Sequence, residues 1–264
     1  MYEFHNDKPT YFQYQYLTSK GYILPFVEQH LPKDRKLNVL EIGCAEAGVL
    51  KAFTELGHQC VGIELMPKRI ELAKKFMTEE LKAGQIKFIN KNIYDIDVEK
   101  DLGVQFDLII LKDVIEHIPN QEVFMKKLLD FLAPNGKVFF GFPPWYMPFG
   151  GHQQICKNKF LAKLPYYHLL PMGLYKQILK IGGESDKTIT NLEEIKETGI
   201  SIERFENIAK QNYSILKQNL FLVNPIYQYK FGLKPRNQIG LIAAIPYVKD
   251  FFSTCAYYLI TPLS

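Results

Sequence analysis

The sequence predicts an α/β protein built on a doubly wound, mostly parallel sheet, and three observations carry that prediction. Apolar runs of strand length alternate with helical patterns along much of the chain. The first run, residues 38–42, ends at a turn of small residues that leads directly into a helical pattern at Gly48. The second run ends at Glu64, about 20 residues past that turn, where this fold class places a ribose-binding carboxylate.

The individual elements follow in order from the hydrophobic pattern. The predicted helices are residues 18–31, 48–56, 67–83, 120–132 and 202–210. The predicted strands are residues 38–42, 58–63, 86–89, 106–111, 138–142, 214–223 and 251–260, with a P-N-G turn at 134–136 before the fifth. The side chains expected to face inward from the first and fourth helices are Ile23, Phe26, Val27 and Leu31, and Val123, Phe124, Leu128 and Phe131.

The turn after the first strand has the residues of a ligand-binding loop. Gly43 permits a sharp turn, Ala45 lets a ligand approach the backbone, and Gly48 permits close packing of helix and strand. Backbone amides of the turn would then face a ligand carboxylate. An ordinary structural corner has similar residues, but Glu41 and Glu64 beside it favour a nucleoside-containing ligand. A nicotinamide dinucleotide and S-adenosylmethionine both fit these features.

Composition constrains the partners and the compartment. The 264-residue chain has a net charge of +4 with widely spread lysines, so nucleic acid is not expected as a partner. Its four cysteines form no C-x-x-C pair, which favours a reduced, cytoplasmic setting. The first residues lack the pattern of a signal peptide, and Pro246, Lys249 and Asp250 interrupt the last apolar stretch, so no transmembrane segment is expected.

Two motifs carry a family resemblance. The string E-I-G-C-A-E-A-G at 41–48 resembles the first motif of class I S-adenosylmethionine-dependent methyltransferases, with Ala45 at the usual second glycine. The string F-D-L-I-I-L-K-D-V-I-E-H-I-P at 106–119 resembles the fourth-strand motif of the same broad family, which contains the ubiquinone-type O-methyltransferases. The resemblance covers residues 37–142. It implies a Rossmann-like sheet of seven strands in the order 3-2-1-4-5-7-6, with strand 7 antiparallel.

The resemblance also implies a set of residues that bind S-adenosylmethionine. These residues are Glu41, Gly43, Cys44, Ala45, Glu64, Leu65, Asn92, Ile93 and Asp113. Glu41 would face the methionine ammonium, Glu64 the ribose hydroxyls, and Asp113 the region of the sulfonium. Asn92 stands where the family has an acid beside adenine, and Ile93 would pack on the adenine ring.

The segment D-V-I-E-H at 113–117 is the candidate for chemistry. Asp113, Glu116 and His117 resemble the magnesium site of ubiquinone-pathway O-methyltransferases and of plant-type small-RNA 2′-O-methyltransferases, and His152 would be a fourth group there. A Mg²⁺ ion at this site would bind the acceptor oxygen and lower its pKa. Many metal-free relatives carry a similar structural turn. Without a metal, His152 or His117 would act as the catalytic general base.

The segments outside the two motifs suggest a domain division. Residues 1–36 would form an N-terminal cap helix and residues 37–264 the methyltransferase domain. A proline- and aromatic-rich stretch at 143–195 would be an inserted lid, and residues 224–247 a smaller insertion that is either a second wall of the acceptor site or a plain surface excursion. In the resembled family the cap closes over the cofactor, so Tyr14 or Tyr16 would line the pocket.

These features predict a methyltransferase that acts on a small-molecule or lipid-like acceptor. Oxygen is the first choice of acceptor atom, and nitrogen remains open because aromatic residues also accommodate cationic amines. The alternatives are a nicotinamide-dependent oxidoreductase and a non-catalytic cofactor-binding subunit. A homodimer is also left open.

Overall fold

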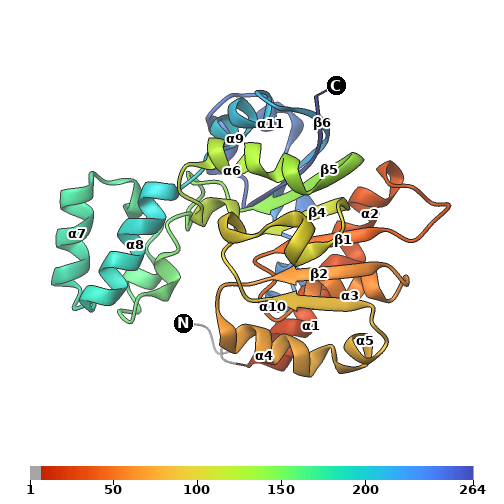
Figure 1. The fold of residues 1–264 in the computed structure, drawn as a ribbon. Helices are drawn as coiled ribbons and strands as arrows, with labels where there is room; N and C mark the ends of the chain where they lie inside the picture. Colours follow the sequence, from red (N-terminus) through yellow and green to blue (C-terminus); the bar gives the residue numbers. More distant parts are fainter. Residues whose placement is uncertain (1–6, 264) are drawn as a thin grey trace.

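The computed structural model describes residues 7–263, and in that range eight strands form one sheet (Figure 1). The strands are β1 (Asn38–Ile42), β2 (Gln59–Ile63), β3 (Ile86–Ile89), β4 (Phe106–Lys112), β5 (Leu132–Phe142), β6 (Tyr213–Val223), β7 (Arg236–Asn237) and β8 (Cys255–Pro262). Their order is β3-β2-β1-β4-β5-β8-β6-β7, and β8 pairs antiparallel with β5 and β6. The seven predicted strands lie in the predicted order, but the predicted count is wrong because the sheet has an eighth strand. The additional edge strand β7 is too short to carry a sequence pattern.

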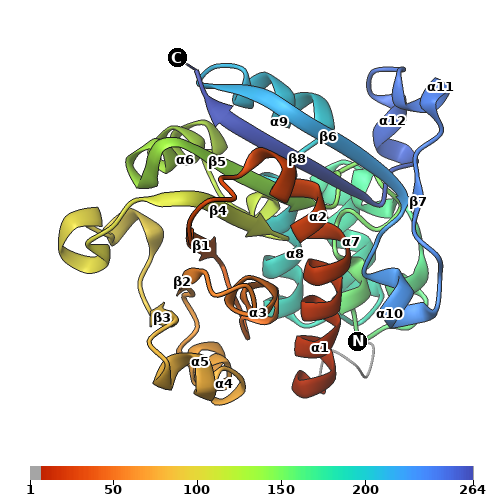
Figure 2. The ribbon, with the colours of Figure 1, turned by 90° about the vertical axis from the view of Figure 1, so that its right-hand side faces the viewer.

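Helices cover both faces of the sheet. The α-helices of the described chain, including those that do not cover the sheet, are α1 (Lys8–Thr18), α2 (Leu24–Val27), α3 (Gly48–Thr54), α4 (Pro67–Phe76), α5 (Thr78–Lys82), α6 (Gln121–Lys127), α7 (Met172–Ile181), α8 (Asp186–Thr198), α9 (Ile202–Ala209), α10 (Tyr227–Phe231), α11 (Gly240–Ala243) and α12 (Val248–Phe251). The side chains of α1, α2, α3 and α4 pack on one face, and α6 and α9 lie on the other (Figure 2). In β4, Leu108 and Ile110 point to the first face, whereas Ile109 and Leu111 point to the second.

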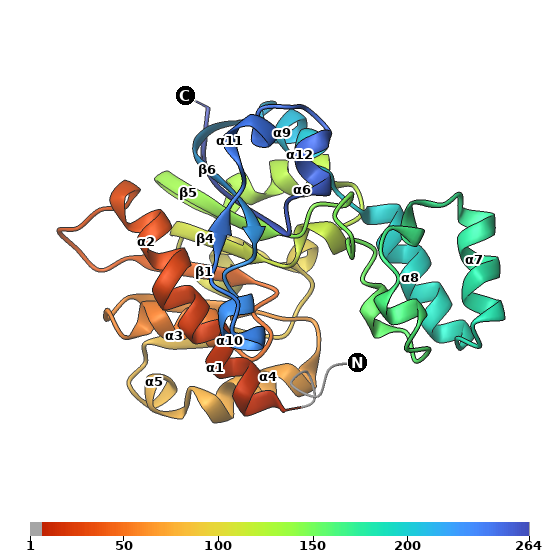
Figure 3. The same ribbon diagram turned by 180° about the vertical axis from the view of Figure 1, so that it is seen from behind.

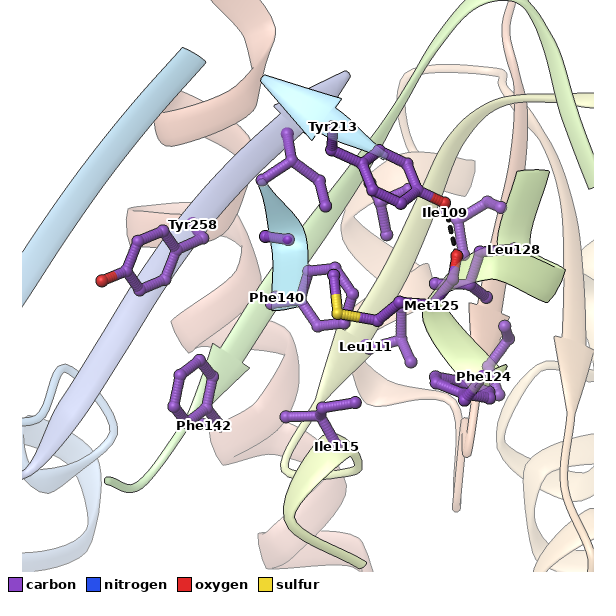
Figure 4. Close-up of a cluster of buried hydrophobic side chains, with 14 of the residues drawn as sticks. Ile109, Leu111, Ile115, Phe124, Met125, Leu128, Phe140, Phe142, Tyr213 and Tyr258 are labelled. Atoms are coloured by element: carbon purple, nitrogen blue, oxygen red, sulfur yellow. Dashed lines mark hydrogen bonds between the residues drawn. The ribbon is translucent and has the colours of Figure 1, made fainter. Parts of the chain in front are cut away.

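The core beneath α6 shows how the sequence sets the rotation of a helix (Figure 4). Phe124, Met125 and Leu128 are fully buried, and the Met125 carbonyl oxygen accepts a 2.7 Å hydrogen bond from the Tyr213 hydroxyl. The prediction that Val123 faces inward is wrong, because its side chain is 60% exposed. The buried positions begin at Gln121, the first residue of α6, and continue at helical spacing from there.

The N-terminal helix begins earlier than residue 18. The Asp7 carboxylate accepts a hydrogen bond from the Thr10 amide, and Pro9 occupies the first turn, so α1 starts at Lys8. A π-helical turn then joins α1 to α2. The four inward residues predicted for this region, Ile23, Phe26, Val27 and Leu31, are buried as expected.

Two predicted strand boundaries are wrong. The predicted P-N-G turn lies inside β5, because pairing with β4 passes from Phe106 opposite Leu132 to Leu108 opposite Lys137, and the extra residues bulge out between these pairs. The last strand begins at Cys255 instead of residue 251. The apolar residues that were predicted to begin this strand, including Phe251, belong instead to α12 and the turn that follows it.

Residues between β5 and α9 form a lobe that projects from the sheet (Figures 1 and 3). Its helices α7 and α8 pack around buried residues of their own, including Tyr175, Leu179 and Leu192. The sequence pattern did not predict these two helices. Among the described residues, no helix has the length and hydropathy required to cross a membrane.

Candidate active site

A cavity of about 930 Å³ lies at the carboxyl ends of β1 and β4. Its walls come from the loop after β1, the turn after β4, the face of α1, the lobe and α10. In doubly wound sheets this is the end at which ligands bind. The predicted residues that line the cavity are Glu41, Gly43, Cys44, Ala45, Asp113, Glu116, His117 and His152.

The loop after β1 is held in a left-handed conformation at three positions. Gly43, Ala45 and Ala47 have φ angles of 71°, 47° and 67°. A Cβ atom on Gly43 would lie 2.6 Å from Cγ2 of Val114, so both its backbone and its surroundings require glycine. The amides of Gly43 and Cys44 donate to the Ile63 carbonyl oxygen at 2.8 and 3.0 Å, so the amides predicted to face a ligand carboxylate have protein partners here.

Gly48 has a different role from the one predicted. Its Cβ would lie 2.5 Å from the carbonyl oxygen of Phe12, which belongs to α1. The close packing at this position is therefore between α3 and α1, not between α3 and a strand. This contact brings α1 against the cavity.

The residues that α1 presents to the cavity are Lys8, Tyr11, Phe12 and Gln15. Tyr14 and Tyr16, the residues predicted to line it, do not. The Tyr16 hydroxyl instead donates a 2.7 Å hydrogen bond to Glu55. The sequence predicted a helix only from residue 18 onward, so the residues of α1 that face the cavity were not predicted.

Glu41 and Glu64 have different environments. Glu41 is 3% exposed at the cavity wall, and its Oε2 atom has no hydrogen-bond partner among the described residues. Burial raises the pKa of Glu41 well above its usual value, although Lys112 opposes this shift. Glu64 accepts hydrogen bonds from the amides of Ala45 at 3.1 Å and Met66 at 2.9 Å, and so joins the loops after β1 and β2.

The residues predicted for the adenosine end lie outside the cavity lining. They are Glu64, Leu65, Asn92 and Ile93. Leu65 is 63% exposed, and Ile93 is packed into the core at 6% exposure. The sequence analysis missed Asn90, whose side-chain amide donates to the carbonyl oxygens of Glu64 and Leu65 at 2.7 and 3.0 Å. An asparagine directly after a predicted strand was the available signal.

An ion pair between a buried lysine and a partly exposed aspartate lies at the end of β4. Lys112 Nζ lies 2.5 Å from Asp113 Oδ2, and the Lys112 side chain is only 2% exposed. Burial would raise the pKa of Asp113, but the Lys112 ammonium outweighs it and holds that pKa below its usual value. The strand predicted from the sequence ended at Leu111, and the ion pair of Lys112 was not predicted.

A cluster of one carboxylate and two imidazoles links the turn after β4 to the lobe. Glu116, His117 and His152 each offer a metal-ligating atom within 4.8 Å of the others. The rings of His117 and His152 lie 4.9 Å apart, and neither carboxylate oxygen of Glu116 has a hydrogen-bond partner in the described part of the chain. The predicted metal set was Asp113, Glu116 and His117, with His152 as a fourth group. The structure brings His152 into that cluster, and Asp113 is instead paired with Lys112.

The protonation states in this cluster follow from its burial. Burial, and then the neighbouring His117, lower the pKa of His152 to about 4, and burial also lowers the pKa of His117. Burial, and then Asp113, raise the pKa of Glu116 well above its usual value. Both imidazoles are therefore neutral at pH 7, which is the form that binds a metal or accepts a proton.

Comparison with known families identifies the chain. Residues 14–148 match the family model described as a methyltransferase domain. The chain belongs to this methyltransferase family. The match spans both motifs identified in the sequence and the strands β1 to β5, of which β1 and β4 end at the cavity.

Similar proteins were found by sequence and by structure. The chain is 26% identical over 117 residues to a ubiquinone biosynthesis O-methyltransferase of Coxiella burnetii (strain Dugway 5J108-111), covering 44% of the chain and 47% of that protein. It is 25% identical over 116 residues to the protein of the same name from Rickettsia bellii (strain OSU 85-389), covering 44% of the chain and 46% of that protein. The methyltransferase chain thus spans about half the length of these curated relatives.

Solved structures share the fold at low identity. The plantazolicin methyltransferase BpumL, solved in complex with SAH, matches with a TM-score of 0.53 and 11% identity over 99% of this chain and 88% of that one. The magnesium protoporphyrin IX methyltransferase (ChlM) from Synechocystis PCC 6803, solved with bound SAM, matches with a TM-score of 0.52 and 12% identity over 94% of this chain and 79% of that one. At this identity the likeness concerns the fold alone.

Proposed function

We propose that the protein transfers a methyl group from S-adenosylmethionine to an oxygen of a small or lipid-like acceptor. The observation that carries the proposal is the arrangement of one cavity, with the buried Glu41 carboxylate and the exposed carboxylate of Asp113 on the sheet side and the cluster of Glu116, His117 and His152 facing the lobe. Family membership supports methyl transfer over the nicotinamide-dependent alternative.

The cofactor site is proposed to comprise the residues predicted from the sequence. The unpartnered Glu41 oxygen fits a ligand ammonium, since a buried carboxylate without a partner is costly. Each Glu64 oxygen accepts one amide hydrogen and keeps a lone pair for a ribose hydroxyl. When bound, S-adenosylmethionine supplies an electrophilic methyl group, and the chain positions the acceptor in line with it and excludes water.

Glu116, His117 and His152 are proposed to hold a divalent cation. The pair of unpartnered Glu116 oxygens beside two neutral imidazoles is a donor set that fits such an ion. Two imidazoles and one carboxylate suit a first-row transition ion such as Mn²⁺ better than Mg²⁺, which prefers oxygen ligands. The ion would lower the pKa of an acceptor hydroxyl. Without an ion, His152 or His117 is the candidate general base for the same proton.

The division of the chain is part of the proposal. We propose that residues 1–36 act as a cap, residues 37–264 as the methyltransferase domain, residues 143–195 as a lid and residues 224–247 as a wall of the acceptor site. Lining residues from the lobe and from α10, such as Met147, Phe149 and Phe231, support an acceptor function. They argue against a non-catalytic subunit, which has no need of such a cavity. A cytoplasmic setting agrees with four buried free cysteines.

Isothermal titration calorimetry with S-adenosylhomocysteine tests the cofactor class. We expect micromolar binding of this product and none of NADH. Adding Mn²⁺ or Mg²⁺ to separate titrations tests the cation, and Glu116→Gln should abolish the cation's own binding heat. Failure to bind S-adenosylhomocysteine, or a preference for NADH, would contradict the proposed function.

A further inference from the structure

The segment from residue 239 to 248 exposes more apolar surface than a closed fold requires. Its sequence, I-G-L-I-A-A-I-P-Y-V, contains no charged residue. Leu241 is 83% exposed, Tyr247 62%, Ile239 55% and Ile245 48%. The short helix α11 that carries Leu241 lies at the periphery of the molecule, beyond β7 at the sheet edge (Figure 2). Contiguous exposed apolar chain of this kind marks an interaction site.

The segment is anchored directly after its C-terminal end, while several of its apolar side chains are exposed. Both Asp250 carboxylate oxygens accept hydrogen bonds from the Ile202 amide, at 3.2 and 3.1 Å. Lys249 pairs with Glu203 and Glu206 of α9 at 3.5 and 3.3 Å. The exposure is therefore a property of a fixed segment.

The charges around the segment select its partner. From residue 225 to 248 the charged residues are Lys230, Lys234 and Arg236, all basic, and the last two are exposed. The acids beside it are Asp250, which is fully buried, and Glu203 and Glu206, which are 12% and 17% exposed and are paired with Lys249. The exposed apolar residues lie next to Lys234 and Arg236, which form no ion pair with a residue in the range 7–263, and this combination matches the acyl chains and anionic headgroups of a lipid surface.

The segment is also continuous with the cavity. Two residues that flank the segment in the sequence line the cavity. Leu233, which is 51% exposed, precedes it, and Thr254 follows it. Between Leu233 and Thr254, Phe251 stacks on Tyr146 of the lobe with ring centroids 5.4 Å apart. Met147, the residue after Tyr146, lines the cavity. A surface that receives residues 239–248 would therefore lie next to the cavity wall.

We propose that residues 239–248, with Lys234 and Arg236, dock the protein on an anionic lipid bilayer. A second copy of the chain fits less well, because protein partners typically contribute about 20–30 residues each, whereas this segment is short. Docking does not depend on the proposed methyl transfer. If both hold, the acceptor is a molecule that partitions into a bilayer and reaches the cavity along Leu233.

Vesicle co-sedimentation tests the docking. We compare vesicles of phosphatidylglycerol and phosphatidylcholine with vesicles of phosphatidylcholine alone, without cofactor. The wild type should bind the anionic vesicles, and the double substitution Leu241→Asp with Ile245→Asp should lower the partition coefficient by at least about tenfold. The matched control is Leu174→Asp with Ile181→Asp, on lobe positions that are 53% and 79% exposed, and it should bind like the wild type.

A second pair of variants tests the charges and does not touch the apolar residues. Lys234→Glu with Arg236→Glu should weaken binding to anionic vesicles. The same charge change at the exposed Lys82 and Lys100 should have less effect. Calorimetry with S-adenosylhomocysteine reports the fold of each variant and tests the proposed function separately. The proposal is overturned if the wild type does not bind anionic vesicles, or if Leu241→Asp with Ile245→Asp binds them as well as the control Leu174→Asp with Ile181→Asp. It is also overturned if analytical ultracentrifugation shows that the segment instead holds together a dimer.

Discussion

The two halves of the cavity are built in different ways. The half at the ends of β1 and β4 consists of short loops, so Glu41 and Asp113 are positioned by the register of buried strands. The other half comes from long excursions after β5 and β6, which are held by packing on one another, as in the stack of Tyr146 on Phe251. Cofactor binding and acceptor handling should therefore be separable by mutation.

The largest expected effect is on the transfer step. Glu116→Gln removes the charge of the proposed cation ligand and keeps its size, so the rate of methyl transfer should fall by about 100-fold or more. Affinity for S-adenosylhomocysteine should change by less than about twofold. The exposed Glu122 of α6 is the control, and Glu122→Gln should leave both quantities unchanged. An equal loss of S-adenosylhomocysteine affinity in Glu116→Gln would assign Glu116 to the cofactor half.

A smaller effect is expected on the cofactor side. Glu41→Gln removes a charge-assisted hydrogen bond of about 1.5–3 kcal/mol, so affinity for S-adenosylhomocysteine should fall by roughly 10- to 150-fold. Calorimetry measures this directly. Wild-type affinity in this variant would remove Glu41 from the ammonium site.

Asp250 tests what holds the excursion after β6. Burial raises the pKa of Asp250 from its ordinary 3.8 to about 7. Because the folded state holds this proton more tightly than the unfolded chain, this group lowers stability as pH rises from about 4 to about 7, by at most about 1.4 kcal/mol per pH unit. Urea unfolding at several pH values should show a shallower decline in Asp250→Asn. An unchanged pH profile would mean that the native carboxyl titrates normally.

The smallest expected effect compares one glycine from each region. Gly48→Ala should cost about 1–3 kcal/mol, because its Cβ would meet the Phe12 carbonyl oxygen at 2.5 Å. Gly173→Ala, in α7 of the lobe, should be neutral or stabilise by up to about 1 kcal/mol, since no atom lies within 4 Å of the added Cβ. Denaturant midpoints measure both, and a reversed order would place the constraint in the lobe.

The sheet was predictable from the sequence, whereas the lobe was not. Strands such as β4 are buried on both faces and appear as continuous apolar runs between turn residues. The lobe is rich in proline and aromatic residues, which obscured α7. The helix α8 did carry a signal that was overlooked, since Ile189, Leu192 and Ile195 lie at helical spacing after the Ser185 cap.

The site shows the same contrast between local and distant information. Glu116 and His117 are neighbours, so the sequence alone predicted their proximity. His152 was expected there only as a fourth group on a lid, and its distance from Glu116 and His117 depends on how the lobe packs, which the structure shows. The partner of Asp113 was missed because Lys112 ends an apolar strand, where a buried ammonium is not expected unless it is paired.

Calorimetry of three proteins with S-adenosylhomocysteine tests most directly whether the two halves are separate. The wild type, Glu41→Gln and His152→Ala are titrated under the same conditions without added metal. We predict weakened binding for Glu41→Gln and wild-type affinity for His152→Ala. Equal losses in both variants, or a loss confined to His152→Ala, would contradict the division of the cavity into a cofactor half on the sheet and an acceptor half on the lobe.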